Sequence, residues 1–295
     1  MMMQAQRVPL TDGRWHFQHG PIDLVIGADG DAAVLAAAHD AAWQRFETVL
    51  TELVAELPLL RRPVRGPCPL QGVLARRMWW ACHPFHSVYI TPMAAVAGAV
   101  AQEVIAAYAR AGVQRAWVNN GGDIALHLAD GASVNVGVVA DVTEAGVDGS
   151  FTVHACMPVR GIATSGWRGR SFSLGIADSV TVLAKTAAMA DAAATIIANA
   201  VDTTDPHIVR RAANEMKDDS DLGDILVTVD VPALPADAVH AALERGRIRA
   251  RDLQRDGLIH SALLTCQQQA ARLDPTADIR VVTDTVARPV GSVFA

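Results

Sequence analysis

Cysteine, aromatic residues and long apolar runs are scarce in this sequence. The chain has four cysteines in 295 residues and no Cys-x-x-Cys pair, and cysteines scattered this widely are expected to be reduced and buried. Aromatic side chains make up 5% of the residues, whereas alanine is abundant, which favours closely packed helices over an aromatic binding surface. The most apolar segment, residues 93–108, is interrupted by Gln102 and Glu103 and is too short to cross a bilayer.

Basic blocks and targeting segments are also absent from the sequence. Without a cluster of lysine or arginine, the chain is not expected to bind nucleic acid. Residues 1–7 are not followed by the apolar segment of a signal peptide, so we expect a cytoplasmic protein without a membrane partner. The chain is 51% apolar with a net charge of −6, which is typical of a soluble globular protein. The G-x-S-x-G, Walker lysine and G-x-G-x-x-G motifs do not occur.

The apolar pattern predicts a mixture of helices and strands. Apolar residues at spacings of three and four predict a helix over 31–57 that Pro58 ends, followed by a Pro- and Arg-rich connector at 59–69. Further helices are predicted at 93–110 (ended by Gly112), 185–201, 236–245 and 247–273. Strands are predicted at 14–26 around a His-Gly-Pro turn and at 115–118, 124–128, 133–139, 154–161, 178–184, 225–231 and from 279. Because these elements show no regular βαβ rhythm, the expected class is α+β rather than doubly wound.

A polar turn lies between two of the predicted strands. It consists of Asn119, Asn120, Gly121, Gly122 and Asp123. The ordinary interpretation is a hairpin turn that the aspartate caps. Two glycines, however, let the backbone come close to a ligand, because no Cβ is in the way. The two asparagines and the carboxylate add more polar groups than a hairpin requires, so a binding site is the favoured interpretation.

A stripe of short polar residues lies on the predicted helix at 185–201. Asp191, Thr195 and Asn199 are spaced four apart among Ala, Ile, Val and Met, so they share one face of the helix. A solvated face is the ordinary explanation, but such faces usually carry Lys, Glu and Arg. Short oxygen donors on an alanine-lined surface suit a small hard cation such as magnesium.

The glycine-bearing segment 163–170 could bind an anion. Thr164 and Ser165 offer hydroxyl groups, and Gly166 exposes a backbone N–H group. Arg168 and Arg170 carry guanidinium groups suited to phosphate. The alternative is an exposed basic loop.

The run Cys82-His83-Pro84-Phe85-His86 has the residue types of a metal site. It has no partner pair elsewhere in the sequence, and Pro84 constrains its backbone. Structural histidines are therefore the favoured interpretation.

Taken in order, these motifs resemble a known superfamily. Asn-Gly-Gly-Asp-Ile, Ala-Thr-Ser-Gly, Ser-Val-Thr-Val and Ala-Asp-Ala-x-Ala-Thr follow one another between residues 94 and 229. This order resembles the ApbE-like superfamily, whose best-known members are FAD:protein FMN transferases. Residues 161–201, with Trp-Arg-Gly-Arg-Ser and Leu-Gly-Ile-Ala-Asp, look closer still to the functionally uncharacterised UPF0280 branch.

The resemblance implies a magnesium site and a flavin nucleotide site. In the transferases the Asp and Thr of the Asp-x-x-Ala-Thr helix hold magnesium, which implies Asp191 and Thr195 here, with Asn120 and Ala194 as carbonyl donors. Their Thr-Ser-Gly loop lies against the flavin nucleotide, which implies the segment 164–166. The transferases also have a His-His-Ile-Asp-Pro-x-Thr-Gly segment, whereas this chain has Ser-Phe-Ser-Leu-Gly-Ile-Ala-Asp at 171–178 and no histidine there.

These observations predict one ApbE-like (T-fold-like) α+β domain of mixed or antiparallel sheets covered by long alanine-rich helices. It comprises a divergent part at 1–92, a motif-bearing core at 93–230 and a C-terminal part at 231–295. We expect a magnesium-dependent enzyme acting on a flavin, a nucleotide or another anionic small molecule. Asp191 would hold the metal and Asp123 would orient the ligand or act as a base. The cofactor-binding residues would be Asn119, Asn120, Gly121, Gly122, Thr164, Ser165, Gly166, Arg168 and Arg170.

Several alternatives remain open at the level of the sequence. The chain could be a non-catalytic protein that binds a flavin or a metabolite, or a metal-assisted amide or ring-opening hydrolase. FAD or FMN is the expected organic cofactor, and a protein acceptor would be a partner if FMN is transferred. Small-residue helices such as 93–110 are suited to pack in a homodimer.

Overall fold

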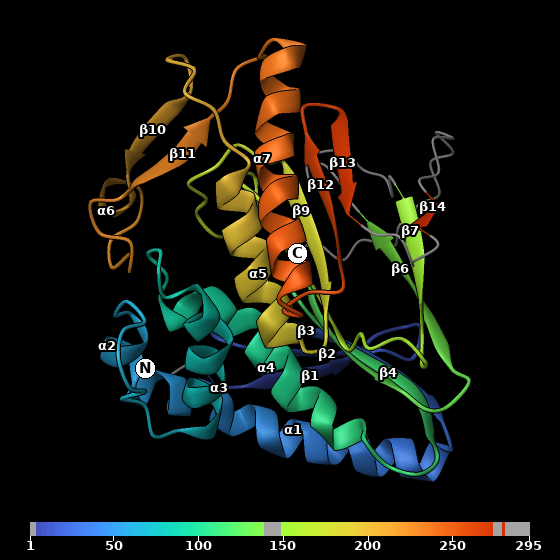
Figure 1. Cartoon of the computed structure of the whole chain (residues 1–295). Helices are drawn as coiled ribbons and strands as arrows, with labels where there is room; N and C mark the ends of the chain where they lie inside the picture. Colours follow the sequence, from blue (N-terminus) through green and yellow to red (C-terminus); the bar gives the residue numbers. More distant parts are fainter. Residues whose placement is uncertain (1–3, 139–148, 274–278, 281–295) are drawn as a thin grey trace. The chain divides into compact units, whose positions relative to one another are not determined.

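The computed structural model describes residues 4–138, 149–273 and 279–280 (Figure 1). The strands are β1 (Gln6–Pro9), β2 (Trp15–His19), β3 (Ile22–Gly30), β4 (Val113–Asn120), β5 (Asp123–Leu128), β6 (Ser133–Val138), β7 (Gly149–His154), β8 (Gly161–Ser165), β9 (Ser179–Ala184), β10 (Val209–Ala212), β11 (Leu226–Asp230), β12 (Ser261–Cys266), β13 (Gln269–Leu273) and β14 (Ile279–Arg280). The helices are α1 (Ala32–Ala55), α2 (Leu57–Leu60), α3 (Val73–Cys82), α4 (Val96–Ile105), α5 (Ala187–Ala200), α6 (Ala213–Met216) and α7 (Ala236–Arg255). Short 3-10 turns are η1 (His83–Phe85), η2 (Pro92–Ala95) and η3 (Ala106–Tyr108).

The largest sheet has nine strands in the order β1-β2-β3-β4-β5-β8-β9-β12-β13. The pairs from β1 to β5, the pair β5–β8 and the pair β12–β13 are antiparallel. Two smaller sheets have the orders β10-β11 and β14-β7-β6. This mixture of antiparallel strands and helices confirms the predicted α+β class.

The chain divides into two compact units. Unit 1 comprises Met1–Ala132, Ala155–Ala163 and Leu183–Ala193. Unit 2 comprises Ser133–His154, Thr164–Val182 and Ala194–Ala295. Strands β8 and β9 and helix α5 have residues in both units. The division of the sequence at residues 92 and 230 stays a prediction.

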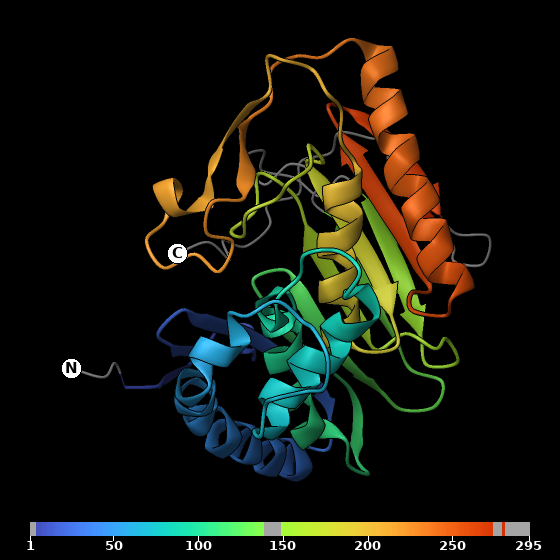
Figure 2. The same cartoon turned by 60° about the vertical axis from the view of Figure 1, so that its left-hand side comes forward.

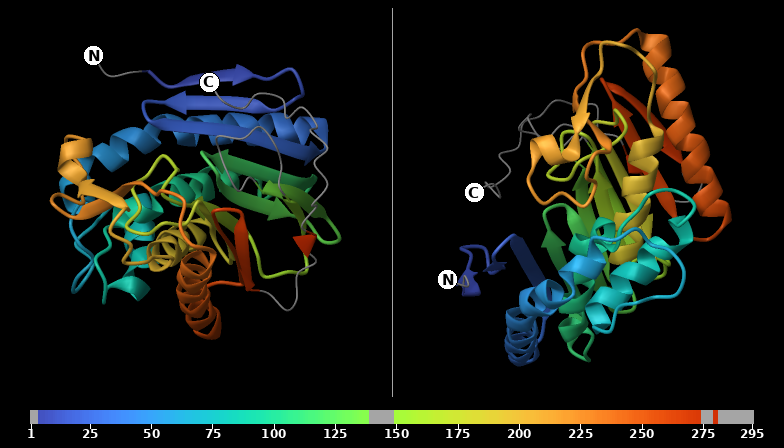
Figure 3. Two further views of the ribbon diagram at one scale, coloured as in Figure 1. Left: turned by 90° about the horizontal axis from the view of Figure 1, so that it is seen from above. Right: turned by 90° about the vertical axis from the view of Figure 1, so that its left-hand side faces the viewer.

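In unit 1, α1 lies against β2 and β3 (Figure 3). Asp31 begins the helix, because its carboxylate accepts hydrogen bonds from the amides of Ala33 and Val34. A stripe of buried side chains then faces the sheet: Ala38, Ala42, Phe46, Val49 and Leu53. Phe46 lies 5.5 Å from the ring of Phe17 on β2. The helix and the hairpin β2–β3 are therefore as predicted.

The predicted helix 93–110 is broken into three pieces: η2, α4 and η3. Ala95, with φ −126° and ψ 14°, separates the 3-10 turn from α4. Gly112 has φ +95°, in the left-handed region that glycine adopts without strain. The sequence therefore predicted helical structure here correctly, but it predicted one continuous helix instead of three pieces. Helix α4 packs on β4 and β5.

In unit 2, α7 packs on the hairpin β12–β13 (Figure 2). The predicted helix at 247–273 is wrong beyond Arg255, because Gly257 with φ +73° ends the helical path. Ala262, Leu264 and Cys266 are buried at every second position, which is the period of a strand. The sequence analysis also predicted two separate helices on either side of Gly246, but this residue lies inside the single helix α7.

Other predicted boundaries need correction. The prediction of an extended segment at 154–161 is wrong, because β7 ends at His154 and a turn follows. Pro58 does not end helical structure but lies in the first turn of α2, where its missing N–H costs nothing. Residues 163–165 belong to β8 rather than to a loop. Val139 and the tail 281–295 lie outside the described residues. Elements that the sequence analysis did not predict include β1, α3, β7, β10 and α6.

All four cysteines are free, as expected. Cys82 and Cys266 are buried, but Cys156 is exposed and Cys68 is half-buried, so the expectation of burial is wrong for these two. None of the helices in the described part of the chain has the length and apolar character that crossing a membrane requires.

Candidate functional site

The polar turn of the sequence is a two-residue hairpin loop between β4 and β5. Asn120 pairs with Asp123 across the hairpin, and Gly121 and Gly122 have φ +63° and +109°. Positive φ at both loop residues is the geometry of a tight hairpin that glycine adopts best. The Oδ1 atom of Asn119 accepts a hydrogen bond from the Gly122 amide at 2.8 Å. The glycines are thus required by the turn itself.

The turn is attached to the first turn of α4 within unit 1. Asn120 is only 7% exposed, and its Nδ2 atom donates to the carbonyl of Ala97 at 3.1 Å. Asp123, 9% exposed, is also buried. The end of β4 and the start of β5 are therefore held beside the N-terminus of a helix.

Asp191 on α5 reaches the same turn of α4. Its Oδ2 atom accepts a hydrogen bond from the Gly98 amide at 2.9 Å. The residue preceding α4 is Ala95, whose side chain cannot cap the helix. The Asp191 carboxylate therefore performs this capping from another helix.

The ionisation of Asp191 is set by burial. Burial raises the pKa of Asp191 to about 7, although hydrogen bonds from the Gly98 and Ala97 amides act in the opposite direction. Among the residues that the structure describes, no cationic side chain contributes to this pKa. Above that pH the carboxylate is a negative charge without a cationic side-chain partner, which favours a bound cation.

The close approach of α4 and α5 depends on a glycine. A Cβ at Gly98 would lie 2.3 Å from the carbonyl oxygen of Ala187 and 2.9 Å from the Cβ of Asp191. Gln102, one turn further along α4, accepts a hydrogen bond from the Ala188 amide at 3.3 Å. Each helix thus caps the first turn of the other.

The Asp191 carboxylate fits magnesium bound in one particular way. Asp191 and Thr195 lie four residues apart on α5 and share a face. The described residues contain no cluster of three or more His, Cys, Asp or Glu side chains able to hold a metal. Magnesium is commonly held by one or two carboxylates together with substrate phosphates and water. The single carboxylate of Asp191 fits that arrangement and does not fit an all-protein cage.

The predicted anion-binding residues belong to unit 2. The Thr164 Oγ1 atom lies 2.9 Å from that of Thr181 on β9, and Ser165 is the last residue of β8. A Cβ at Gly166 would lie 2.2 Å from the Asp178 carbonyl oxygen, so only glycine fits there. The Gly166 carbonyl accepts the Gly169 amide at 3.2 Å, which closes a turn.

Arg168 is paired within its own unit. Its Nε atom lies 3.2 Å from Oδ1 of Asp178, and its guanidinium lies 5.0 Å from the ring centroid of Trp167. Asp178 also accepts the Trp167 Nε1–H at 3.2 Å and the Gln267 amide. Arg170 is exposed. The aspartate that orients Arg168 was not identified from the sequence.

Asn199 has a local structural partner. Its Oδ1 atom accepts the Leu174 amide at 2.9 Å and the Ser173 hydroxyl at 3.3 Å. The third member of the polar stripe on α5 thus anchors the segment around Ser173 and Leu174. Sequence reasoning missed the partner residues Ala97, Gly98 and Gln102 in unit 1 and Asp178 in unit 2. Of these, only Gly98 carries a signal, a glycine inside an apolar helical pattern.

Comparisons with known proteins show which proteins this chain is similar to. The family model described as AbpE bacteria matches residues 5–273. A UPF0280 protein of Methanopyrus kandleri is 37% identical over 202 residues, which are 67% of this chain and 78% of that protein. A UPF0280 protein of Methanothrix thermoacetophila is 35% identical over 158 residues, 52% of this chain and 64% of that protein. The apo structure of the Pseudomonas stutzeri flavinyl transferase ApbE is also similar. The structural match spans 92% of this chain and 96% of the transferase chain, with 12% sequence identity and a TM-score of 0.46.

Proposed function

The chain belongs to the UPF0280 family, and we propose that it is a magnesium-dependent enzyme acting on a flavin, a nucleotide or another anionic small molecule. The observation that supports this proposal is the environment of Asp191. Its carboxylate is held by backbone amides of Ala97 and Gly98 alone among the described contacts, with its pKa raised by burial. A carboxylate oxygen that accepts one N–H keeps further lone pairs for a cation.

The residues around Asp191 have distinct roles in this proposal. Asp191 and Thr195 hold the cation, and backbone carbonyls of Asn120 and Ala194 complete the protein's share of the ligands. Magnesium when bound supplies Lewis-acid stabilisation of charge on a phosphoryl or carbonyl oxygen. Asp123 orients the ligand or accepts a proton.

A separate part of the proposal concerns the segment 164–170. Thr164, Ser165 and Gly166 supply hydroxyl and N–H donors to the anionic part of the ligand. The fork of Arg168, oriented by Asp178, and the exposed Arg170 add positive charge. The reaction class that we propose is transfer of FMN to a protein acceptor, and the small-residue segment 93–110 is suited to pack in a homodimer.

A thermal-shift screen tests this function. The purified protein is heated with FAD, FMN, ADP or AMP, each with and without magnesium, at pH 8, where the Asp191 carboxylate is ionised. A ligand that binds only the folded state raises the melting temperature. We expect a magnesium-dependent rise with at least one of these ligands.

The matched control is Asp191→Asn. The amide keeps an oxygen for the Gly98 N–H but removes the charge, so the magnesium-dependent rise should disappear while the protein stays folded. An equal rise in both proteins would contradict the assignment of Asp191. Release of AMP from FAD separates an enzyme from a protein that only binds the flavin, because a non-catalytic protein would show the thermal shift without AMP.

A further inference from the structure

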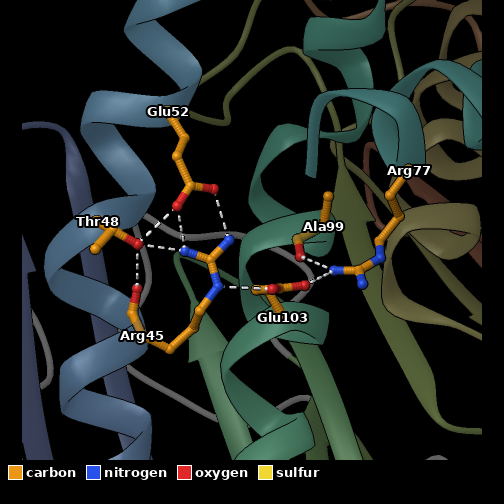
Figure 4. Close-up of polar contacts among 6 residues, drawn as sticks. All are labelled: Arg45, Thr48, Glu52, Arg77, Ala99 and Glu103. Atoms are coloured by element: carbon orange, nitrogen blue, oxygen red, sulfur yellow. Dashed lines mark hydrogen bonds and ion pairs between the residues drawn. The ribbon is translucent and has the colours of Figure 1, made fainter. Parts of the chain in front are cut away.

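A charged network joins the helices α1, α3 and α4 of unit 1 (Figure 4). Arg45 on α1 forms two hydrogen bonds of 2.7 Å with Glu52 and one of 2.7 Å with Glu103 on α4. Arg77 on α3 contacts the other oxygen of Glu103 and lies 3.5 Å from the Ala99 carbonyl. Figure 4 shows the Glu103 carboxylate between the two guanidinium groups.

Helix α4 therefore has two sides with different partners. Gly98 and Gln102 are one turn apart and contact α5. Glu103 follows Gly98 by five residues, which turns it about 140° around the helix axis. Ala99 and Glu103 share that second side and meet Arg77. Because Ala99 and Glu103 each follow an α5-facing residue, Gly98 or Gln102, by one position, the network holds α4 on a side about 100° around the helix axis from the one that contacts α5.

Glu103 is the central charge of this network. Its side chain is 15% exposed, whereas that of Glu52 is 41% exposed. Burial acts to raise the pKa of Glu103, but the hydrogen bonds from Arg45 and Arg77 outweigh burial and hold the pKa below its ordinary value. Without this charge, Arg45 would keep only Glu52 as a carboxylate partner, and the half-buried Arg77 would lose the carboxylate that neutralises it.

We propose that Glu103 is a positioning residue for Asp191. By holding α4 between α1 and α3, it fixes the Gly98 amide against the Asp191 carboxylate and so sets the affinity of that carboxylate for a divalent cation. The effect on cation affinity rests on the proposed function, whereas the effect on the position of the Gly98 amide does not.

The test compares Glu103→Gln with Glu52→Gln. Both variants remove one carboxylate charge from Arg45, but only the first also releases α4 from Arg77. The readouts are hydrogen exchange of the Gly98 amide by NMR and Mn²⁺ binding by calorimetry, with thermal unfolding recorded for each variant. We expect Glu103→Gln to raise the exchange rate of the Gly98 amide and to weaken Mn²⁺ binding, each by about tenfold. Glu52→Gln should change neither by more than about twofold.

Two results would overturn the inference. One is an exchange rate and an Mn²⁺ affinity in Glu103→Gln within about twofold of the wild type. The other is a change in the Gly98 exchange rate and in Mn²⁺ affinity that is as large in Glu52→Gln as in Glu103→Gln. If Glu103→Gln does not fold, Arg77→Gln replaces it, because it removes the cation that α3 presents to Glu103 and leaves Arg45 paired with Glu103 and Glu52. Equal Mn²⁺ affinity in the wild type and Asp191→Asn would contradict the proposed function alone, and the Gly98 exchange rate would still decide the role of Glu103.

Discussion

The Gly98 amide donates to the Asp191 carboxylate at 2.9 Å, and this bond crosses between two helices that are 93 residues apart in the sequence. One turn further along α4, Gln102 accepts the Ala188 amide. Each helix therefore supplies a side chain to the first turn of the other. An acidic group at such a place is stabilised by the helix dipole, which explains how Asp191 is held without a cationic side chain.

Gly98→Ala should separate α4 from α5. The new methyl group would lie 2.3 Å from the Ala187 carbonyl oxygen, which is backbone and cannot rotate away. We expect a loss of about 1–3 kcal/mol in the free energy of unfolding, measured by urea denaturation. Gly246→Ala on α7 is the matched control, since its methyl group would meet side-chain methyl groups of Val201 and Leu264. A loss below about 0.5 kcal/mol in Gly98→Ala would show that α4 and α5 do not pack as closely as described.

Elements with a strong local pattern were predictable from the sequence. The apolar stripe of α1, the two-glycine turn after Asn120 and the alanine-rich α5 were all found within a few residues. The hairpin β12–β13 was not. Its turn is Gln267–Gln268, two residues with positive φ that lack the Asn-Gly or Asp-Gly signature. Since no local signal separated α7 from β12, the helix was extended through the strands.

The candidate site was predictable only in part for a related reason. Asp191 and Thr195 stand out because short polar residues at helical spacing interrupt an alanine-rich run. Gly98 and Asp178 are partners of predicted residues, but those contacts join segments distant in sequence or depend on a loop path. Such contacts are set by packing, which a single sequence does not display. The roles predicted for Asp123, Thr164 and Arg170 stay predictions.

Asn199→Ala should loosen the segment that follows Arg170. It removes the acceptor of the Leu174 amide and the Ser173 hydroxyl, and the buried Ser173 would have to find another partner. A loss of about 1–3 kcal/mol in thermal or urea unfolding is expected. Asn199→Asp keeps an acceptor oxygen and should recover part of that loss. Equal losses in both variants would show that the acceptor is not what matters at this position.

Arg168→Ala should reduce stability, and the exposed Arg170→Ala should not. Arg168 loses its ion pair with Asp178 and its contact with the Trp167 ring, for which we expect about 1 kcal/mol. Arg170→Ala is expected to stay within about 0.5 kcal/mol of the wild type. If the segment also binds an anion, ligand affinity should fall in Arg168→Ala and depend less on salt. Unchanged affinity for every ligand found in the thermal-shift screen would leave Arg168 with a structural role only.

His39 should make the protein less stable as the solution becomes acidic. Its Nδ1 atom lies 2.6 Å from the hydroxyl of Tyr108, and burial lowers the pKa of His39 below its ordinary value of 6.5. The unfolded chain therefore takes up a proton at a higher pH than the folded protein does, so acidification through about pH 6.5 favours unfolding. Replacing the histidine by glutamine, which can still bond Tyr108, should flatten the dependence of the unfolding free energy on pH between about 7.5 and 5.5. Tyr108→Phe is the control: it should cost about 1 kcal/mol at every pH but keep the slope, because the His39 ring stays in place. A steeper fall in His39→Gln than in the wild type would mean that the histidine is stabilised, not destabilised, when protonated.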